Sequence, residues 1–371
     1  MKFSISSKLL LSHLSTVSKV VNTKNTISIL DNFLFCLEGD KLIITGSDQE
    51  TILTTTVEVA FAEGEGSFAV NVKSLLDLLK EIPDQPLEFT IDENYAIELK
   101  YLNGHFDFSG IDGNEFPQKE SLGEVAESIV MPVKELRESI DYTLFAVGTE
   151  EMRRIMMGIY WDIKEDNITF VASDTHKLVR FENTRLKPGI TSSFILPSKP
   201  ASILNGIIGK NDDDDVKITF DTKSATFETG NFTLTCRFIN GRYPNYNSVI
   251  PQNNPFVISI DRISLLNAVK RVSVFSSAGG MVKFDISENQ LKLTAENLDF
   301  MKKAEETVAC DYKGENMSIG FNDEKLIEIL TNINSDIVII KLLDPTRAGI
   351  FLPDSQPEGE NLLMLLMPMM L

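Results

Sequence analysis

The sequence predicts an α+β fold made of three tandem repeats of one domain, each with two helices packed against antiparallel sheets. An alternating strand followed by a small polar turn begins at Asp40, again at Asp166 and again at Asn289. These starts are 126 and 123 residues apart, and a third of the chain is about 124 residues. Because the spacing matches a third of the chain, we predict a triplicated domain.

A second landmark recurs in the same phase. A strand end, a polar cap and a short amphipathic helix begin at Ala69, Ile195 and Ile319, which are 126 and 124 residues apart. A duplicated domain must preserve more than one element, so this agreement supports the repeat.

The helix that opens each repeat is the third landmark. It is expected to begin near Ser6, Pro132 and Asp261. In the first copy the apolar residues recur from Leu10 at i, i+4, i+7 and i+11, which is the spacing of one helix face. Each repeat therefore opens with an amphipathic helix.

The domains are expected at residues 1–122, 130–252 and 255–371, with polar linkers at 120–128 and 251–255. Each has about eight short strands rich in Ile, Val, Thr and Phe. Two helices per domain are too few to alternate with these strands as βαβ units, so the sheets should be antiparallel.

The charge balance restricts the possible partners. Thirty-five Lys and Arg against 54 Asp and Glu give a net charge of −19. A chain this acidic is repelled on average by phosphate and by anionic lipid. A globally basic nucleic-acid binder is excluded, and only a local basic surface within an acidic shell remains compatible with DNA.

The cysteines and the apolar runs indicate a cytoplasmic protein. Cys36, Cys236 and Cys310 are odd in number and nowhere paired as CxxC, which favours neither a disulfide framework nor a zinc ribbon. The apolar run at Leu9–Leu11 has no cleavage site after it. The C-terminal run Leu362–Leu371 is much shorter than the roughly 20 residues that cross a bilayer, so no membrane span is expected.

No catalytic constellation is recognisable. The three histidines, His13, His105 and His176, have no neighbour at metal-ligand spacing, and HExxH, GxSxG and GxGxxG are absent from the sequence. We expect no enzyme, no cofactor and no metal. The competing interpretation is a hydrolase that uses some of the scattered carboxylates.

The C-terminal tail is apolar up to its last residue, whereas chain ends are normally polar and frayed. One interpretation is a final edge strand held by core packing. The other is one wall of an apolar groove, for which flexible methionines suit varied partners. The two interpretations are compatible.

Three short stretches of the sequence together resemble one protein family. SDTHKL (Ser173–Leu178), GRYPNY (Gly241–Tyr246) and the terminal MPMML (Met367–Leu371) are similar to the TDGHRL-like loop, the GRFPDY-like turn and the MPMRL-like tail of the bacterial DNA polymerase III β subunits, the replicative sliding clamps. The resemblance covers all three repeats in order. Further similar stretches are MKFSI at the start, TISIL from Thr26 and SENQLKLTA from Ser287.

The resemblance implies a groove, on the middle and last domains, that binds short linear peptides of the replicative polymerase, the clamp loader and repair proteins. Three positions depart from the family: Thr175 replaces a glycine, Lys177 an arginine and Met370 the penultimate arginine, so peptide preference is expected to differ. The groove residues implied are Met156, Ser173, Thr175, His176, Lys177, Leu178, Pro244, Ser248, Val249, Leu365, Leu366, Met367, Pro368, Met369, Met370 and Leu371.

The resemblance also implies a head-to-tail homodimer that closes a ring around duplex DNA, with helices lining the hole. DNA contact would then be phosphate-based, independent of sequence and salt-sensitive. Basic residues could face inward while the acidic excess stays outside. The DNA-facing residues expected are Lys19, Lys24, Lys73, Lys80, Lys134, Arg137, Lys199 and Lys270.

For the dimer junction, Phe106 in the first domain and Val272 and Val274 in the last are apolar candidates, with ordinary core positions as the alternative. The function implied is a non-catalytic clamp that tethers the polymerase and makes replication processive. The rival from the interaction class is a peptide-binding scaffold that never encloses DNA and remains a monomer.

Overall fold

The computed structural model describes residues 1–22, 24–117, 123, 126–209, 214–277 and 279–371. Most of the linker expected at 120–128 lies outside these residues. By its internal contacts the chain divides into two compact units, residues 1–137 with 199–238, and residues 138–198 with 239–371. Each is described by itself.

The first repeat contains two helices, α1 (Ser7–Val17) and α2 (Val72–Glu81), and two short 3₁₀ helices, η1 (Ser28–Asp31) and η2 (Gly113–Glu115). Its strands are β1 (Lys2–Ser6), β2 (Asn32–Glu38), β3 (Lys41–Ser47), β4 (Thr51–Glu58), β5 (Phe61–Glu63), β6 (Gly66–Asn71), β7 (Pro86–Ile91), β8 (Ala96–Tyr101), β9 (Gly104–Ser109) and β10 (Ile111–Asp112).

The middle repeat contains α3 (Val133–Leu144), α4 (Ser198–Ile207), η3 (Glu151–Met156) and η4 (Tyr246–Val249). Its strands are β11 (Glu127–Pro132), β12 (Gly158–Lys164), β13 (Asn167–Ser173), β14 (Lys177–Asn183), β15 (Ser192–Pro197), β16 (Asp215–Phe220), β17 (Ser224–Thr229) and β18 (Phe232–Arg237).

The last repeat contains α5 (Arg262–Ser273) and α6 (Asp323–Asn332). Its strands are β19 (Phe256–Asp261), β20 (Met281–Ser287), β21 (Gln290–Asn297), β22 (Lys302–Ala309), β23 (Met317–Asn322), β24 (Ile337–Leu342), β25 (Gly349–Pro353), β26 (Glu360–Leu366) and β27 (Pro368–Met369).

The three repeats have the same strand order. One block of four runs β6-β2-β3-β4 in the first repeat, β15-β12-β13-β14 in the second and β23-β20-β21-β22 in the third. The other runs β1-β7-β8-β9, β11-β16-β17-β18 and β19-β24-β25-β26. Among the described residues every strand pair is antiparallel and each repeat has two α-helices, so the predicted α+β triplication is confirmed.

The sheets continue from one repeat into the next. β4 pairs with β18 to give a nine-stranded sheet, and β14 pairs with β26 to give an eight-stranded sheet. The two compact units therefore divide the middle repeat, because each of its blocks is hydrogen-bonded to a neighbouring repeat. β9 and β22 are edge strands within the described chain.

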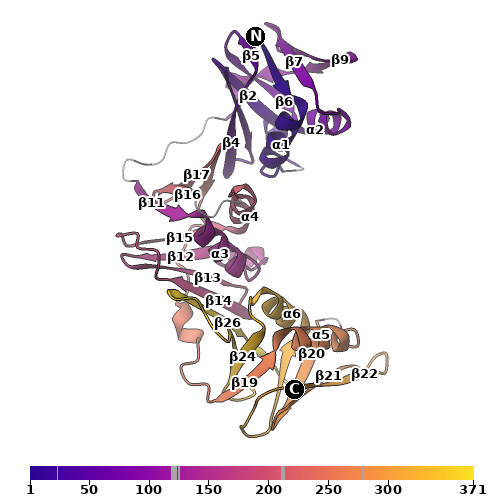
Figure 1. Ribbon diagram of the computed structural model, residues 1–371, viewed down its shortest axis with the longest axis vertical. Coiled ribbons are helices and arrows are strands. Elements are labelled where there is room, and N and C mark those ends of the chain that lie inside the picture. Colours follow the sequence, from indigo (N-terminus) through magenta and orange to yellow (C-terminus); the bar gives the residue numbers. More distant parts are fainter. Residues whose placement is uncertain (23, 118–122, 124–125, 210–213, 278) are drawn as a thin grey trace. The chain divides into compact units, whose positions relative to one another are not determined.

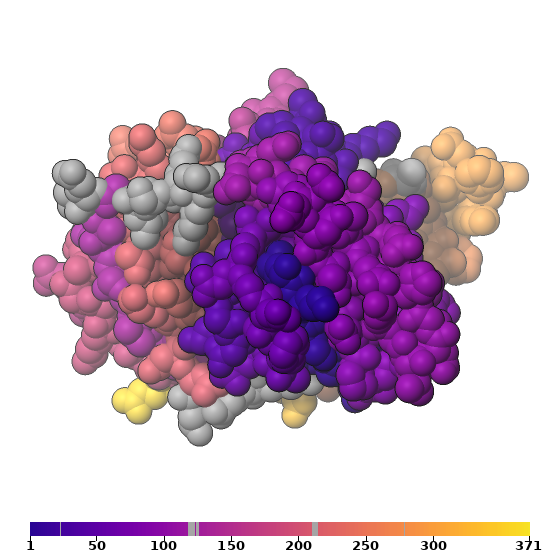
Figure 2. All heavy atoms as spheres, turned by 90° about the horizontal axis from the view of Figure 1, so that it is seen from above, coloured from indigo at the N-terminus to yellow at the C-terminus, as the bar shows by residue number. Residues whose placement is uncertain are grey.

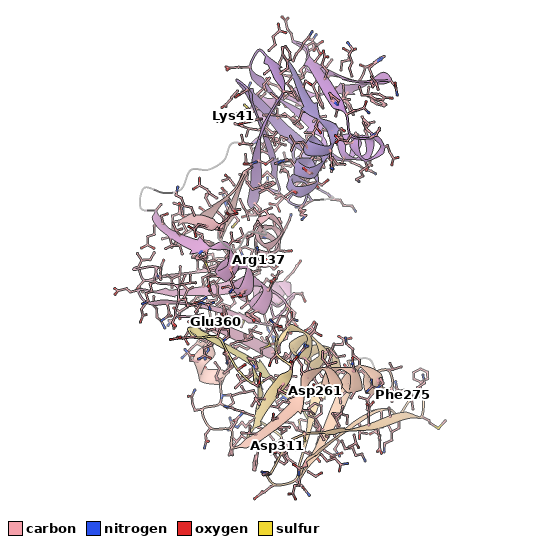
Figure 3. All side chains as sticks on the ribbon, in the orientation of Figure 1. Lys41, Arg137, Asp261, Phe275, Asp311 and Glu360 are labelled. Carbon is pink, nitrogen blue, oxygen red and sulfur yellow. The ribbon has the colours of Figure 1, made fainter. Side chains whose placement is uncertain are left out.

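The opening helices are amphipathic, as predicted. Leu10, Leu14 and Val17 of α1 are buried, and the Ser6 side chain caps its N-terminus by accepting the Leu9 N–H. Asp261 caps α5 in the same way (Figure 3). α5 lies beside α6 against β20, β21 and β22 (Figure 1). In each repeat the apolar helix face thus covers a sheet.

The chain begins inside its own domain. β1 pairs with β5 on one side and with β7 on the other, and Figure 2 shows its dark indigo atoms enclosed by violet atoms of the same repeat. Phe3 stacks on Phe89 with ring centroids 4.7 Å apart, and both are buried. In the part of the chain that the structure describes, no helix is long and apolar enough to span a membrane.

Candidate functional site

An apolar cluster forms where β14 of the middle repeat pairs with β26 of the last. Leu178 stands opposite Leu365, and Met156 packs against the cluster from η3. We call this group the seam cluster, and its buried members are Val171, Leu178, Ile195, Tyr243, Tyr246, Ile250, Ala348, Ile350, Leu363 and Leu365. The predicted groove residues Leu178 and Leu365 are therefore in its interior.

Polar and exposed residues surround the seam cluster. Val249 of η4 is 52% exposed and lies between the cluster members Tyr246 and Ile250. The Tyr243 hydroxyl is buried and has no hydrogen-bond partner among the described residues. The seam cluster is therefore a buried apolar core with at least one exposed apolar residue, Val249, beside it in the sequence.

The β13–β14 turn borders the cluster and is fixed by its own side chains. The Ser173 hydroxyl donates to the Lys177 carbonyl at 2.8 Å and accepts the Thr175 N–H at 3.1 Å. Thr175 has φ +77°, which strains a β-branched residue by roughly 1–2 kcal/mol. Arg153 Nη1 donates to its hydroxyl at 2.8 Å, so η3 supports the strained residue.

The Lys177 side chain, which the resemblance places among the groove residues, is buried in this structure. Lys177 is 4% exposed, and its ammonium lies 3.1 Å from Asp174 and 2.6 Å from Glu328 of α6. Lys325 of α6 lies 2.5 Å from the same Asp174 carboxylate. A buried ammonium needs such carboxylates because its desolvation is otherwise costly. Lys177 therefore stabilises the turn through its buried ion pairs with Asp174 and Glu328.

Asp174 makes this turn sensitive to acid. Burial alone would raise the pKa of its carboxyl, but Lys325, the backbone N–H of Lys177 and the Lys177 charge outweigh burial and lower the pKa to about 2. Because the folded-state pKa lies below the unfolded value, the stabilisation is complete above pH 4 and is lost as the pH falls toward 2.

We expect Asp174→Asn to lower the free energy of unfolding at pH 7 by about 2 kcal/mol. About half of that difference should have disappeared at pH 3, because wild-type Asp174 becomes protonated on unfolding. Urea unfolding of both chains between pH 7 and pH 3 measures this. A difference that does not change with pH would contradict the low pKa.

The C-terminal tail continues from β26 along the edge of another sheet. The Met367 N–H donates to the His176 carbonyl at 2.8 Å, and β27 pairs Pro368 with Phe321 and Met369 with Gly320. Met370 is 98% exposed. The expected edge strand is confirmed, and the tail passes the turn at Met367 and ends beside Gly320 of β23, with Met370 facing solvent.

The basic residues expected to face DNA divide into two groups. The first group has partners within the chain: the Lys199 ammonium donates to the Val20 carbonyl and Asn22 and lies 2.5 Å from Asp48. Arg137 donates to the Gly209 carbonyl (Arg137 is labelled in Figure 3). Lys80 pairs with Asp77 at 3.2 Å while remaining exposed.

The other group has no hydrogen bond or ion pair to any described residue. It lies on helices α2, α3 and α5 and in the segment that follows α1, and its members are exposed: Lys19, Lys24, Lys73, Lys134 and Lys270.

Charge separates by secondary structure. The six α-helices of the described chain carry ten basic and eight acidic residues. The rest of the sequence holds 25 of the 35 basic and 46 of the 54 acidic residues. The acidic excess thus resides almost wholly in strands and loops, and the helix surfaces are close to neutral or weakly basic.

Of the apolar residues expected at a dimer junction, Phe106 is half-buried on edge strand β9 and Val274 is 74% exposed. Val272 is 2% exposed inside its own domain, so it belongs to the core. Sequence reasoning missed Phe275, which is 38% exposed and extends from the end of α5 in Figure 3. It also missed the tip of the β21–β22 turn, where Met301 is 94% exposed.

No cluster of three or more His, Cys, Asp or Glu side chains that could hold a metal occurs among the described residues. His13 bonds Thr55 and stacks on Phe232, and His176 lies on the turn. The geometry instead offers a surface for partners.

Three repeats of one α+β domain, joined edge to edge through their sheets, define a DNA-clamp architecture. Family models for the N-terminal, central and C-terminal domains of the DNA polymerase III beta subunit match residues 1–120, 130–245 and 247–370. The chain belongs to this family. It is a sliding clamp of DNA replication, the subunit that makes the polymerase processive, and the predicted family and function are confirmed.

Relatives of known structure agree over the whole chain. The sliding clamp of Bartonella birtlesii bound to griselimycin is 28% identical with a TM-score of 0.95, and each chain covers 100% of the other. A Pseudomonas aeruginosa sliding clamp crystallised with a ligand is 28% identical with a TM-score of 0.92 and the same coverage. The Staphylococcus aureus beta sliding clamp is 24% identical over 97% of both chains.

Proposed function

We propose that the chain is a non-catalytic processivity subunit of the cytoplasm. Two copies join head to tail, encircle duplex DNA and bind the replicative polymerase, the clamp loader and repair proteins through peptides at the seam cluster. The three domains of this proposal are residues 1–122, 130–252 and 255–371. The observation that carries the proposal is the strand order, which leaves one complementary edge at each end of the repeat series.

Within the chain each repeat is joined to the next by the same kind of strand pairing. The last strand of one block, β4 or β14, pairs with the last strand of the next repeat's other block, β18 or β26. The same pairing leaves β22 without a following repeat and β9 without a preceding one. A second copy supplies both missing partners, and the heterologous contact closes when the rotations sum to a full turn.

The existing junctions show which residues meet on the inner sheet face. Leu53 faces Leu234 across the first junction, and Val179 faces Met364 across the second. All four side chains are 0% exposed. An apolar pair at this position is therefore part of the core once the strands are joined.

Counting along the hairpin ladders puts Ala304 of β22 and Phe106 of β9 at the equivalent position. Both are only half-buried in the single chain. A small side chain opposite a phenyl ring would complete the core layer of a third junction, which supports pairing of these two edges between copies.

The same register places one pair of opposite charges face to face. Lys303 would stand opposite Asp107, and these side chains are 56% and 75% exposed in the single chain. Opposite charges directly across an antiparallel pair favour the pairing by roughly 0.2–1 kcal/mol.

The seam cluster supports the peptide-binding part of the proposal. A relative with 28% identity binds the ligand griselimycin, and here Met156 packs on a buried apolar cluster. Thr175, on the turn before the cluster residue Leu178, and Met370, near the end of the tail, are both exposed, so these departures from the family motif would alter which peptide sequences bind best.

The test of the proposed function is the solution mass at several protein concentrations, followed by retention on DNA. A species near twice 41.5 kDa that stays on closed circular DNA and slides off linear DNA is expected. A monomer at micromolar concentration that still binds peptide would favour the scaffold function. Turnover with a divalent metal would favour the hydrolase.

The unpaired lysines lead to a separate prediction about DNA. Replacing Lys19, Lys24, Lys134 and Lys270 by Gln should weaken binding to a short duplex and reduce the slope of log K against log salt by at least about one unit, since each phosphate contact contributes roughly 0.9. Fluorescence anisotropy across a salt series measures the slope.

The matched control replaces four exposed lysines that lie neither in an α-helix nor in the segment after α1: Lys41, Lys187, Lys223 and Lys313. It removes the same charge and should leave the slope within experimental error. An equal reduction in both variants would show that only net charge matters and would contradict inward placement of Lys19, Lys24, Lys134 and Lys270.

A further inference from the structure

One ion pair recurs at both junctions inside the chain. At the first junction Asp48 follows β3. Its Oδ1 accepts the N–H groups of Glu50 and Thr51 at 3.1 and 2.8 Å, and its Oδ2 lies 2.5 Å from Nζ of Lys199. Lys199 is the second residue of α4 in the next repeat. The carboxylate thus fixes the turn with one oxygen and holds the neighbouring repeat with the other.

At the second junction Asp174 occupies the equivalent position after β13. Its Oδ1 accepts the N–H groups of His176 and Lys177 at 2.9 and 2.8 Å, and its Oδ2 lies 2.5 Å from Nζ of Lys325. Lys325 is the third residue of α6. The two junctions therefore share one arrangement, an Asp at the strand end and a Lys in the first turn of the next repeat's second helix.

The third copy of this position is Asn297, which pairs with Lys302 at the end of the β21–β22 ladder. Asp48 and Asp174 occupy the next position beyond their own ladders, where their N–H groups donate to the Thr51 and Lys177 carbonyls. The Oδ1 of Asn297 accepts the Phe300 N–H at 3.2 Å, so it fixes its turn as the aspartates do. Its other atom is Nδ2, which donates to the Ser276 carbonyl at 3.5 Å. An amide nitrogen cannot accept a hydrogen bond from an ammonium.

The matching lysine is present. Lys73 is the second residue of α2, as Lys199 is of α4. It is exposed and has no hydrogen bond or ion pair to any residue that the structure describes. In a head-to-tail ring the first repeat of one copy follows the last repeat of the other, so Lys73 would meet Asn297 of the second copy.

We propose that the junction between copies lacks the Asp–Lys ion pair that holds both junctions within the chain, because Asn297 replaces the aspartate. The proposal rests on the ring described above and adds to it. It assigns Lys73 to the junction between copies rather than to DNA.

The proposal predicts a gain of affinity. Asn297→Asp should restore the ion pair and tighten the dimer dissociation constant roughly tenfold, since a ring has two such junctions and a partly exposed pair contributes up to about 1 kcal/mol. The gain should shrink in 1 M NaCl, and the half-life of the ring on circular DNA should lengthen. Sedimentation velocity over a dilution series measures the constant.

Two further variants identify the cause. Lys73→Met in the Asn297→Asp chain should abolish the gain, because the new carboxylate then has no ammonium to pair with. Asn289→Asp adds the same charge at the other end of the β20–β21 hairpin and should leave the constant within about twofold, since no helix lysine is expected opposite it.

The outcomes separate the two proposals. If wild type dimerises and Asn297→Asp does not tighten the dimer, or tightens it equally with and without Lys73, the ion-pair proposal is overturned and the ring stands. If neither chain dimerises at any concentration, both are overturned. A tighter dimer that depends on Lys73 supports both.

Discussion

A chain that ends at Leu366 binds a clamp-motif peptide at least about 100-fold more weakly than the full chain, while its dimer mass is unchanged. The deletion removes Met367, whose N–H bonds the His176 carbonyl, and the exposed apolar residues that follow. One wall of the proposed groove is then absent. A loss of 100-fold corresponds to about 2.7 kcal/mol, which is within the range of a few well-placed interface residues.

The fold should tolerate the deletion. β27 contributes only the pairs Pro368–Phe321 and Met369–Gly320, and β26 still ends in Leu366, which is 0% exposed in the intact chain. We expect the free energy of unfolding to fall by about 1–2 kcal/mol. Peptide titration by calorimetry and urea unfolding on the same preparations separate the two effects.

The matched control is Val257→Ser, which removes an exposed apolar side chain from β19 at the far edge of the same eight-stranded sheet. It should bind peptide as wild type does. If the truncated chain unfolds or loses its dimer together with peptide binding, the tail is structural and the groove assignment loses its main support.

Periodicity was enough to predict the triplication because a duplicated domain repeats its strand, turn and helix positions at a fixed interval. Ser6, Asn71, Asp261 and Asn322 each cap a helix through the side chain, and such caps are local signals that a sequence displays directly. Fold class and helix starts were therefore predictable from neighbouring residues alone.

Whether a given basic side chain forms an ion pair or remains unpaired was not predictable, because its partners lie far away in the sequence. Lys199 meets Asp48 and Lys177 meets Glu328, each 151 residues apart. Nothing next to either lysine distinguishes it from the unpaired Lys134. Val272 likewise lies on the buried face of α5, two residues before exposed Val274. Burial at a helix end depends on the sheet beneath it.

The features of the proposed groove likewise divide into those that the sequence could predict and those that it could not. The SDTHKL and GRYPNY segments and the tail were identified through resemblance, and the structure brings them around the seam cluster. Sequence alone did not reveal the ion pairs of Asp174 with Lys177 and Lys325. The presence of Asn297 where the other repeats have aspartate is recognised only when equivalent positions are compared across the repeats.

Phe106→Asp should raise the dimer dissociation constant at least about 100-fold. In the single chain the Phe106 ring stacks on Tyr101 with centroids 5.4 Å apart and remains half-buried. Pairing with β22 of a second copy would complete its burial opposite Ala304. A carboxylate there loses about 2 kcal/mol of apolar burial at each of two junctions and is itself desolvated. Sedimentation velocity gives the constant.

Val130→Asp is the control, because Val130 is a 63% exposed apolar residue on β11, an edge strand to which no partner is assigned. It should leave the dimer intact. The register itself is tested by Ala304→Lys, which should also dissociate the dimer when introduced alone. Combined with Phe106→Asp it should recover at least about tenfold of the lost affinity, because the two charges then face each other directly across the strands. Additive losses in the double variant would mean that β9 and β22 pair in another register, or not at all.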